Sequence, residues 1–273
     1  VAGTENIRTN TNATFLQNIN VGVAITAGKL GIGFTDTNVK VGNTALDSLT
    51  TGTNNIGVGQ GTLTANTTGS NNVAVGSLTL DATTTGSSLT AVGNGALGSN
   101  TTASFNSAFG LNALGANTTG AVNDAFGYYA LNQNTTGAAN VAFGSRALQN
   151  NTTASSNTAM GRDALRLNTT GTGNVAVGAF SLDANTTADS NTAIGYQSLS
   201  ANTTGYQNTA VGEQSLILNT TGNRNTAIGF ESLEDNTTGH YNTGLGYGSL
   251  ASNTTADYNV AIGYETLKVN TTG

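Results

Sequence analysis

A unit of seventeen residues repeats fourteen times between Asn38 and Gly273, without one insertion or deletion. Its consensus is N-x-A-[VI]-G-x-x-[AS]-L-x-x-N-T-T-G-x-x, and its positions are numbered below as places one to seventeen. Place five is Gly and place nine is Leu in every copy, and places thirteen and fourteen are always Thr-Thr. A fixed period of this kind indicates stacked, nearly identical units rather than a globular domain built around one pocket.

The residue types of the repeat favour short strands and tight corners. Thr, Val and Ile suit strands, Gly and Asn suit corners, and the chain contains no Pro that would interrupt a hydrogen-bond ladder. Strands of successive coils would lie about 4.8 Å apart, so fourteen coils would span roughly 65–70 Å. The sequence therefore predicts an all-β fold, a parallel β-solenoid (β-roll) of fourteen 17-residue coils over residues 38–273. Residues 1–37 form a separate N-terminal region.

Stacking turns each place of the repeat into a column, and two apolar columns are candidates for the core. We expect buried side chains at place nine, with Leu46, Leu148, Leu216 and Leu267, and at place four, with Val75, Phe126, Ile194 and Ile228. Two large apolar residues per coil contribute about 1.5–3 kcal/mol each. Ordering the backbone costs about 1–2 kcal/mol per residue. This balance predicts a homo-oligomer, since packing against other copies would add buried area.

The N-terminal region contains an alternating pattern that predicts a strand. Ile19, Val21, Val23 and Ile25 fall on one side of it. Such a strand would either cap the first coil or pair with a neighbouring subunit, because the open end of a solenoid offers unpaired N–H and C=O groups. The second alternative predicts head-to-tail filaments.

The Asn-Thr-Thr segments match the acceptor sequence for N-glycosylation, for example at Asn66, Asn117, Asn219 and Asn270. We favour a structural explanation, because stacked Asn side chains can hydrogen-bond from coil to coil. Glycosylation along one edge of the solenoid is the alternative.

The Thr-Thr columns also suggest an ice-binding face, since a regular solenoid would present Thr side chains in a flat array. Neighbouring residues of a strand point to opposite faces. Only one Thr of each pair can therefore be presented, and the hydroxyl of the other is expected to bond to backbone.

Most Tyr and charged side chains fall at the variable places six, seven, sixteen and seventeen. Tyr206, Tyr241 and Tyr258 are candidates for surface contacts, because Tyr is favoured at the centres of interfaces. They would contribute to a lateral interface or to the binding of surface glycans.

Composition argues against several classes of function. There is no Cys, a single His and no basic cluster in a chain of net charge −6, so we expect no metal site, cofactor or nucleic-acid partner. The acidic residues are scattered over variable places, which predicts that the protein is not an enzyme. No apolar stretch is long enough for a membrane span.

The segment from Asn208 to Gly222, N-T-A-V-G-x-x-S-L-x-x-N-T-T-G, resembles repeats of bacterial surface proteins and of phage-tail-fibre-like proteins. Its NTAVG part is similar to the NSVAIG core of trimeric autotransporter adhesin (YadA-like) heads. That resemblance implies parallel β-rolls that associate as trimers and bind host or environmental surfaces. We expect an extracellular or cell-surface fibre, filament or adhesin shaft. The alternative is a binding module for ice or glycans.

Overall fold

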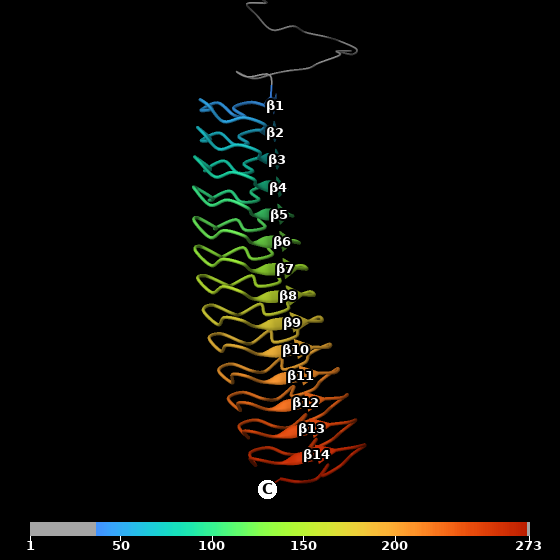
Figure 1. Ribbon diagram of the computed structural model, residues 1–273. Coiled ribbons are helices and arrows are strands. Elements are labelled where there is room, and N and C mark those ends of the chain that lie inside the picture. Colours follow the sequence, from blue (N-terminus) through green and yellow to red (C-terminus); the bar gives the residue numbers. More distant parts are fainter. Residues whose placement is uncertain (1–36, 272–273) are drawn as a thin grey trace, which may run out of the picture. The chain divides into compact units, whose positions relative to one another are not determined.

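The computed structural model describes residues 37–271, and the strand expected at Ile19, Val21, Val23 and Ile25 lies outside them. The described residues form fourteen strands of three residues each, all parallel, in a single sheet whose strand order is the sequence order. Each strand pairs with the strand one repeat away, so that Phe126 lies opposite Phe143. Figure 1 shows the strands one below another along one side of the stack. The predicted all-β parallel solenoid is confirmed.

The strands occupy places two to four of the repeat. Their bounds are β1 Val39–Val41, β2 Ile56–Val58, β3 Val73–Val75, β4 Thr90–Val92, β5 Ser107–Phe109, β6 Asp124–Phe126, β7 Val141–Phe143, β8 Thr158–Met160, β9 Val175–Val177, β10 Thr192–Ile194, β11 Thr209–Val211, β12 Thr226–Ile228, β13 Thr243–Leu245 and β14 Val260–Ile262.

The corners of each coil depend on left-handed backbone conformations. Gly127, at place five, has φ of +145°, and a Cβ added there would lie 2.4 Å from the carbonyl oxygen of Gly144 in the next coil. This contact explains why place five is Gly in every copy. Leu131, at place nine, has φ of +51°. A non-glycine residue pays roughly 1–2 kcal/mol for that conformation, which burial of the leucine side chain offsets.

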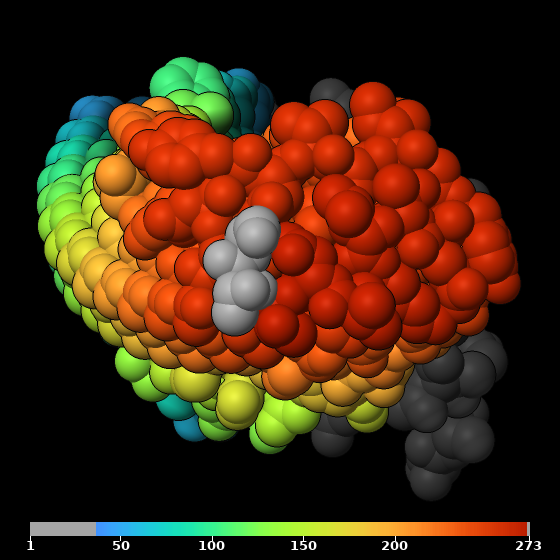
Figure 2. All heavy atoms as spheres, turned by 90° about the horizontal axis from the view of Figure 1, so that it is seen from below, coloured from blue at the N-terminus to red at the C-terminus, as the bar shows by residue number. Residues whose placement is uncertain are grey.

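The interior of the solenoid consists of the leucines of place nine and the small residues of place three. Leu148 and Leu216 are fully buried and Leu46 is 3% exposed, as predicted. Leu267 is 49% exposed, so its assignment to the core is wrong, because no coil of the described residues follows to cover it. Figure 2 looks onto the C-terminal end of the stack, where the last coil is red and earlier coils are visible along its edge.

The prediction for place four is also wrong. Val75, Ile194 and Ile228 are 36%, 40% and 39% exposed, and Phe126 is only partly buried. Side chains alternate along a strand, and here places two and four point outward while place three points inward. Ala125 is accordingly fully buried beside the exposed side of Phe126. The inner face of each strand therefore carries the residue of place three, which is Ala in most coils.

Buried asparagines close two corners of each coil. Asn134 donates from Nδ2 to Oδ1 of Asn117 in the preceding coil at 2.8 Å, and to the carbonyl oxygen of Gly137 at 2.9 Å. At place one, the backbone N–H of Asn140 donates to Oδ1 of Asn123 at 3.0 Å. These ladders satisfy polar groups that would otherwise be buried without partners.

Candidate binding surfaces

The outer face of the sheet carries a continuous column of apolar side chains. We name the side chains of place four, one per strand from Val41 on β1 to Ile262 on β14, the apolar column. It contains only Val, Ile, Leu, Phe and Met, and no charged side chain interrupts it. The rings of Phe109, Phe126 and Phe143 stack along it, with centroids 4.7 and 5.5 Å apart.

Around β5 to β7 the apolar surface extends beyond the column. Phe105 and Val122 precede strands β5 and β6 at place seventeen and are 65% and 57% exposed. Leu111 and Tyr128 follow the same strands at place six and are 40% and 53% exposed. The middle of the solenoid therefore presents exposed apolar side chains on both sides of the column, and the exposed Asp124 at place two of β6 lies among them.

The asparagines of the Asn-Thr-Thr segments are not available for modification in the folded coils. Asn66, Asn117 and Asn219 are fully buried, and the Nδ2 atom of each donates hydrogen bonds inside the solenoid. A glycan could not reach these nitrogens, so the glycosylation hypothesis is wrong for them. Asn270, in the last described coil, is half-buried, and modification there stays a prediction.

The two threonines of each repeat differ in exposure, as the sequence predicted. Thr118, at place thirteen, is partly buried, and its hydroxyl donates to the carbonyl oxygen of Thr135 at 2.9 Å. Thr119, at place fourteen, is exposed. The same pattern recurs in successive coils, so exposed threonines follow one corner at every seventeenth residue from Thr51 to Thr255. One Thr per coil faces solvent.

The three tyrosines chosen from the sequence lie at one corner and belong to a continuous row. Tyr241 and Tyr258 stack with centroids 5.0 Å apart and rings inclined by 6°. The guanidinium of Arg224 lies 5.3 Å from the ring centre of Tyr241 and 5.5 Å from that of Tyr206. Arg224 also donates to the hydroxyl of Tyr241 and, at 2.9 Å, to Oε1 of Gln207. The structure thus joins Tyr206, Arg224, Tyr241 and Tyr258 into what we call the aromatic row.

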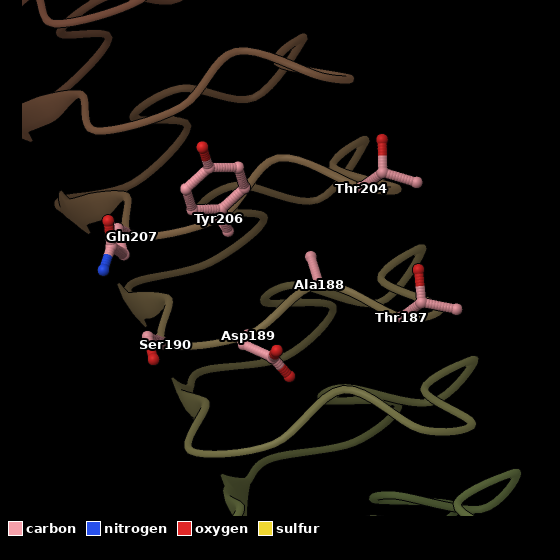
Figure 3. A pocket seen from close by; sticks show the side chains of 7 residues that line it. All are labelled: Thr187, Ala188, Asp189, Ser190, Thr204, Tyr206 and Gln207. Atoms are coloured by element: carbon pink, nitrogen blue, oxygen red, sulfur yellow. The ribbon is translucent and has the colours of Figure 1, made fainter.

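Beside the first residue of this row lies a shallow depression of about 310 Å³. Its lining comes from places fourteen to seventeen of two adjacent coils: Thr187, Ala188, Asp189, Ser190, Thr204, Tyr206 and Gln207. Figure 3 looks onto the face of the Tyr206 ring, with Ala188 and Asp189 in the coil below it. Asp189 was not among the candidates from the sequence. Its position beside Tyr206, in the adjacent coil, is visible only when the coils are stacked.

A charged cluster occupies another corner. The carboxylate of Asp163 is 2% exposed and lies 2.8 Å from Arg146, 3.8 Å from Arg162 and 3.7 Å from Arg166. In the next coil, burial raises the pKa of Asp183, and the nearby guanidinium of Arg166 partly opposes this. The cluster holds three guanidinium groups and two carboxylates, and the ion pair between Arg146 and Asp163 links adjacent coils.

Two other acidic side chains have raised pKa values. Burial raises the pKa of Asp81, and hydrogen bonds from the backbone of Asp81 and Ala82 oppose the shift. Burial also raises the pKa of Glu234, with smaller contributions from the like charges of Glu231 and Asp235. In each case desolvation of the charged carboxylate is the leading cause.

Within residues 37–271, no three His, Asp or Glu side chains gather closely enough to hold a metal ion. The Nδ1 atom of His240 accepts a hydrogen bond from the backbone N–H of Asn223 at 3.0 Å, which gives this side chain a structural role.

Over the described part of the chain, no helix is long and apolar enough to cross a membrane. Comparison of the chain with protein-family models, with curated proteins and with solved structures found no match.

Proposed function

We propose that this chain is a structural subunit of an extracellular or cell-surface fibre, filament or adhesin shaft, and that its copies associate through the apolar column. The observation that supports this proposal most directly is the apolar column itself, since place four is apolar in every strand from β1 to β14. Soluble monomers rarely expose a continuous apolar surface larger than a few hundred Å².

The dimensions of this face suit a protein–protein interface. Fourteen strands about 4.8 Å apart and about 10 Å long give a surface on the order of 600 Å². The exposed apolar side chains around β5 to β7 add to it. A stable interface buries about 800 Å² per partner. A second copy of the chain is a suitable occupant, because two parallel copies have the same coil spacing and can pack column against column.

The mechanism of such a shaft is mechanical. Backbone hydrogen bonds link each coil to the next, for example from the N–H of Leu131 to the carbonyl oxygen of Ala147 at 2.9 Å. The asparagine ladders and the buried leucines repeat the same connection in most coils. A repeat protein of this kind resists bending along its length and separates whatever is attached at its two ends.

The test introduces charge into the apolar column. The double variant Phe126→Asp with Ile228→Asp should dissociate the assembly, because it buries carboxylates at the interface. The matched control, Thr136→Asp with Thr238→Asp, adds the same charges in the same coils at the exposed corner and should leave the assembly intact. Light scattering gives the mass in solution and electron microscopy shows fibres. Equal masses for both double variants and the parent chain would refute the proposal. Accessibility to externally added protease on intact producing cells tests the location.

A second candidate function, ice binding, rests on the exposed threonines of place fourteen. Their spacing is that of the strands, about 4.8 Å, and the hydroxyls of Thr119 and its equivalents make no hydrogen bond within the described residues. Thermal hysteresis that is lost in Thr119→Lys and Thr136→Lys variants would support it. Absence of hysteresis and of recrystallisation inhibition in the parent chain would dismiss it.

A further inference from the structure

The depression beside Tyr206 lies where a hydrogen-bond ladder at place sixteen is interrupted. In several coils the side chain of place sixteen accepts a hydrogen bond from the backbone N–H of place sixteen in the preceding coil. Thr172 donates in this way to Oδ1 of Asp189 at 2.6 Å, and Tyr206 donates to Oδ1 of Asn223 at 2.8 Å. A tyrosine side chain cannot accept in this position, because its only oxygen lies at the far end of the ring.

Several polar groups around this interruption have no partner within the described residues. The backbone N–H of Asp189 and the second carboxylate oxygen, Oδ2, make no hydrogen bond within the described residues. The hydroxyls of Thr187 and Thr204 are exposed and also unpaired there. One strong acceptor, one backbone donor and two hydroxyls therefore line the same depression of about 310 Å³.

The ring of Tyr206, which lines the same depression, is contacted by the guanidinium of Arg224. Tyr206 is 39% exposed. The guanidinium of Arg224, 5.5 Å from its centre, is itself fixed by Gln207 and Tyr241. Figure 3 shows one face of this ring toward the viewer, with Ala188 in the adjacent coil. An ordered ring with a free face loses little entropy when a flat apolar group stacks on it.

We propose that this depression binds a neutral pyranose, such as a terminal hexose of a surface glycan. One face of a pyranose is lined by C–H groups and can stack on Tyr206. Its hydroxyls both donate and accept, so they can pair with Oδ2 and the N–H of Asp189 and with the threonine hydroxyls. The carboxylate of Asp189 disfavours acidic sugars by like-charge repulsion. The site requires a single chain, so it does not depend on self-association through the apolar column.

The experiment is ligand-observed saturation-transfer NMR on the full 273-residue chain. The probes are the methyl glycosides of β-glucose, β-galactose and α-mannose, with methyl β-glucuronide as the acidic comparison. At least one neutral glycoside should show transfer, and glucuronide less. Tyr206→Ala should weaken binding about three- to tenfold, the loss expected for one aromatic contact. Tyr258→Ala removes an exposed tyrosine of the aromatic row outside the depression and should leave binding unchanged.

A second variant separates ligand binding from folding. Asp189→Asn keeps an oxygen for the N–H of Thr172, as Asn223 does for Tyr206. It should weaken the neutral glycosides and reduce the preference over glucuronide. Asp257→Asn, at the same place of another coil, is the matched control. No transfer to any neutral glycoside, or equal transfer in the Tyr206→Ala and Tyr258→Ala variants, would overturn the proposal.

Discussion

The ring of Phe126 stacks on that of Phe109 in the preceding coil, with centroids 4.7 Å apart and planes inclined by 8°. Both rings lie on the outer face of the sheet, while Ala125, their neighbour in sequence, is fully buried. In most proteins, large apolar side chains such as Phe are buried in the core. Here the outer face of β5 and β6 carries large apolar side chains, while the inner face carries alanines.

The two faces of β6 should respond oppositely to substitution. Ala125→Leu should destabilise the fold by about 1–3 kcal/mol, because place three has no room for more than a methyl group. At the equivalent place of β2, a Cβ added to Gly57 would already lie 3.4 Å from Cγ of Leu46. Phe126→Leu should change the free energy of unfolding little and weaken self-association. Chemical denaturation and light scattering measure the two effects, and a stable Ala125→Leu variant would contradict the assigned orientation.

Glycines at two places should differ in their tolerance of a side chain. Gly127→Ala should cost more than about 3 kcal/mol, since the new Cβ would lie 2.4 Å from the carbonyl oxygen of Gly144 and could be relieved only by parting the coils. Gly173→Ala should cost at most about 1 kcal/mol. Its φ of +67° is shared by non-glycine residues at the same place, and its Cβ would meet only Oγ of Ser190, at 3.8 Å. Similar denaturation midpoints for the two variants would contradict this account.

The asparagine ladder should be a major source of stability. Asn117→Ala removes the acceptor for Nδ2 of Asn134 and the donor to the carbonyl oxygen of Gly120. Leaving buried polar groups unpaired costs about 1–3 kcal/mol each. Gln133→Ala, an exposed change one residue before Asn134, should be nearly neutral. Hydrogen exchange at the corner of the two coils locates the effect, and unchanged protection in Asn117→Ala would show that the ladder contributes little.

The solenoid should gain stability on mild acidification through Asp81. Burial raises the folded-state pKa of Asp81 above its ordinary value of 3.8. Between that value and the raised pKa, the folded state binds more protons than the unfolded state, so stability falls as pH rises through this window. Asp81→Asn should therefore stabilise the chain at pH 7, and the gain should vanish near pH 3, where both states are protonated. Thermal unfolding at the two pH values checks this, and a destabilised variant at pH 7 would reverse the assigned sign.

The fold was predictable because the period is unbroken. An identical spacing of Gly, Leu and Thr-Thr in every copy indicates stacked units, and the burial of Leu148 and Leu216 follows from their place in the repeat. The orientation of the strands was harder to predict. Places three and four both carry apolar residues, and only the positions of the corners decide whether the alanine or the larger residue faces inward. The sequence analysis placed the larger residue of place four in the core, and this prediction was wrong.

The candidate sites were predictable only in part. Tyr206, Tyr241 and Tyr258 stood out by residue type, and the structure places them at one corner. The depression beside Tyr206 depends on Asp189, seventeen residues earlier, and on a hydrogen bond that a tyrosine cannot make. This depression exists because two neighbouring coils differ in sequence. A consensus of the repeat does not contain that difference and therefore cannot predict the depression. The Asn-Thr-Thr segments show the opposite case. Their sequence suggests glycosylation sites, but Asn66, Asn117 and Asn219 are buried in the folded coils.

The central claim is that copies of this chain associate through the apolar column, and sedimentation equilibrium tests it most directly. The account predicts a mass that is a multiple of 27.3 kDa for the parent chain, and a mass of 27.3 kDa for the variant with Phe126→Asp and Ile228→Asp. A parent chain that remains at 27.3 kDa over the full concentration range, with the apolar column exposed to solvent, would contradict it.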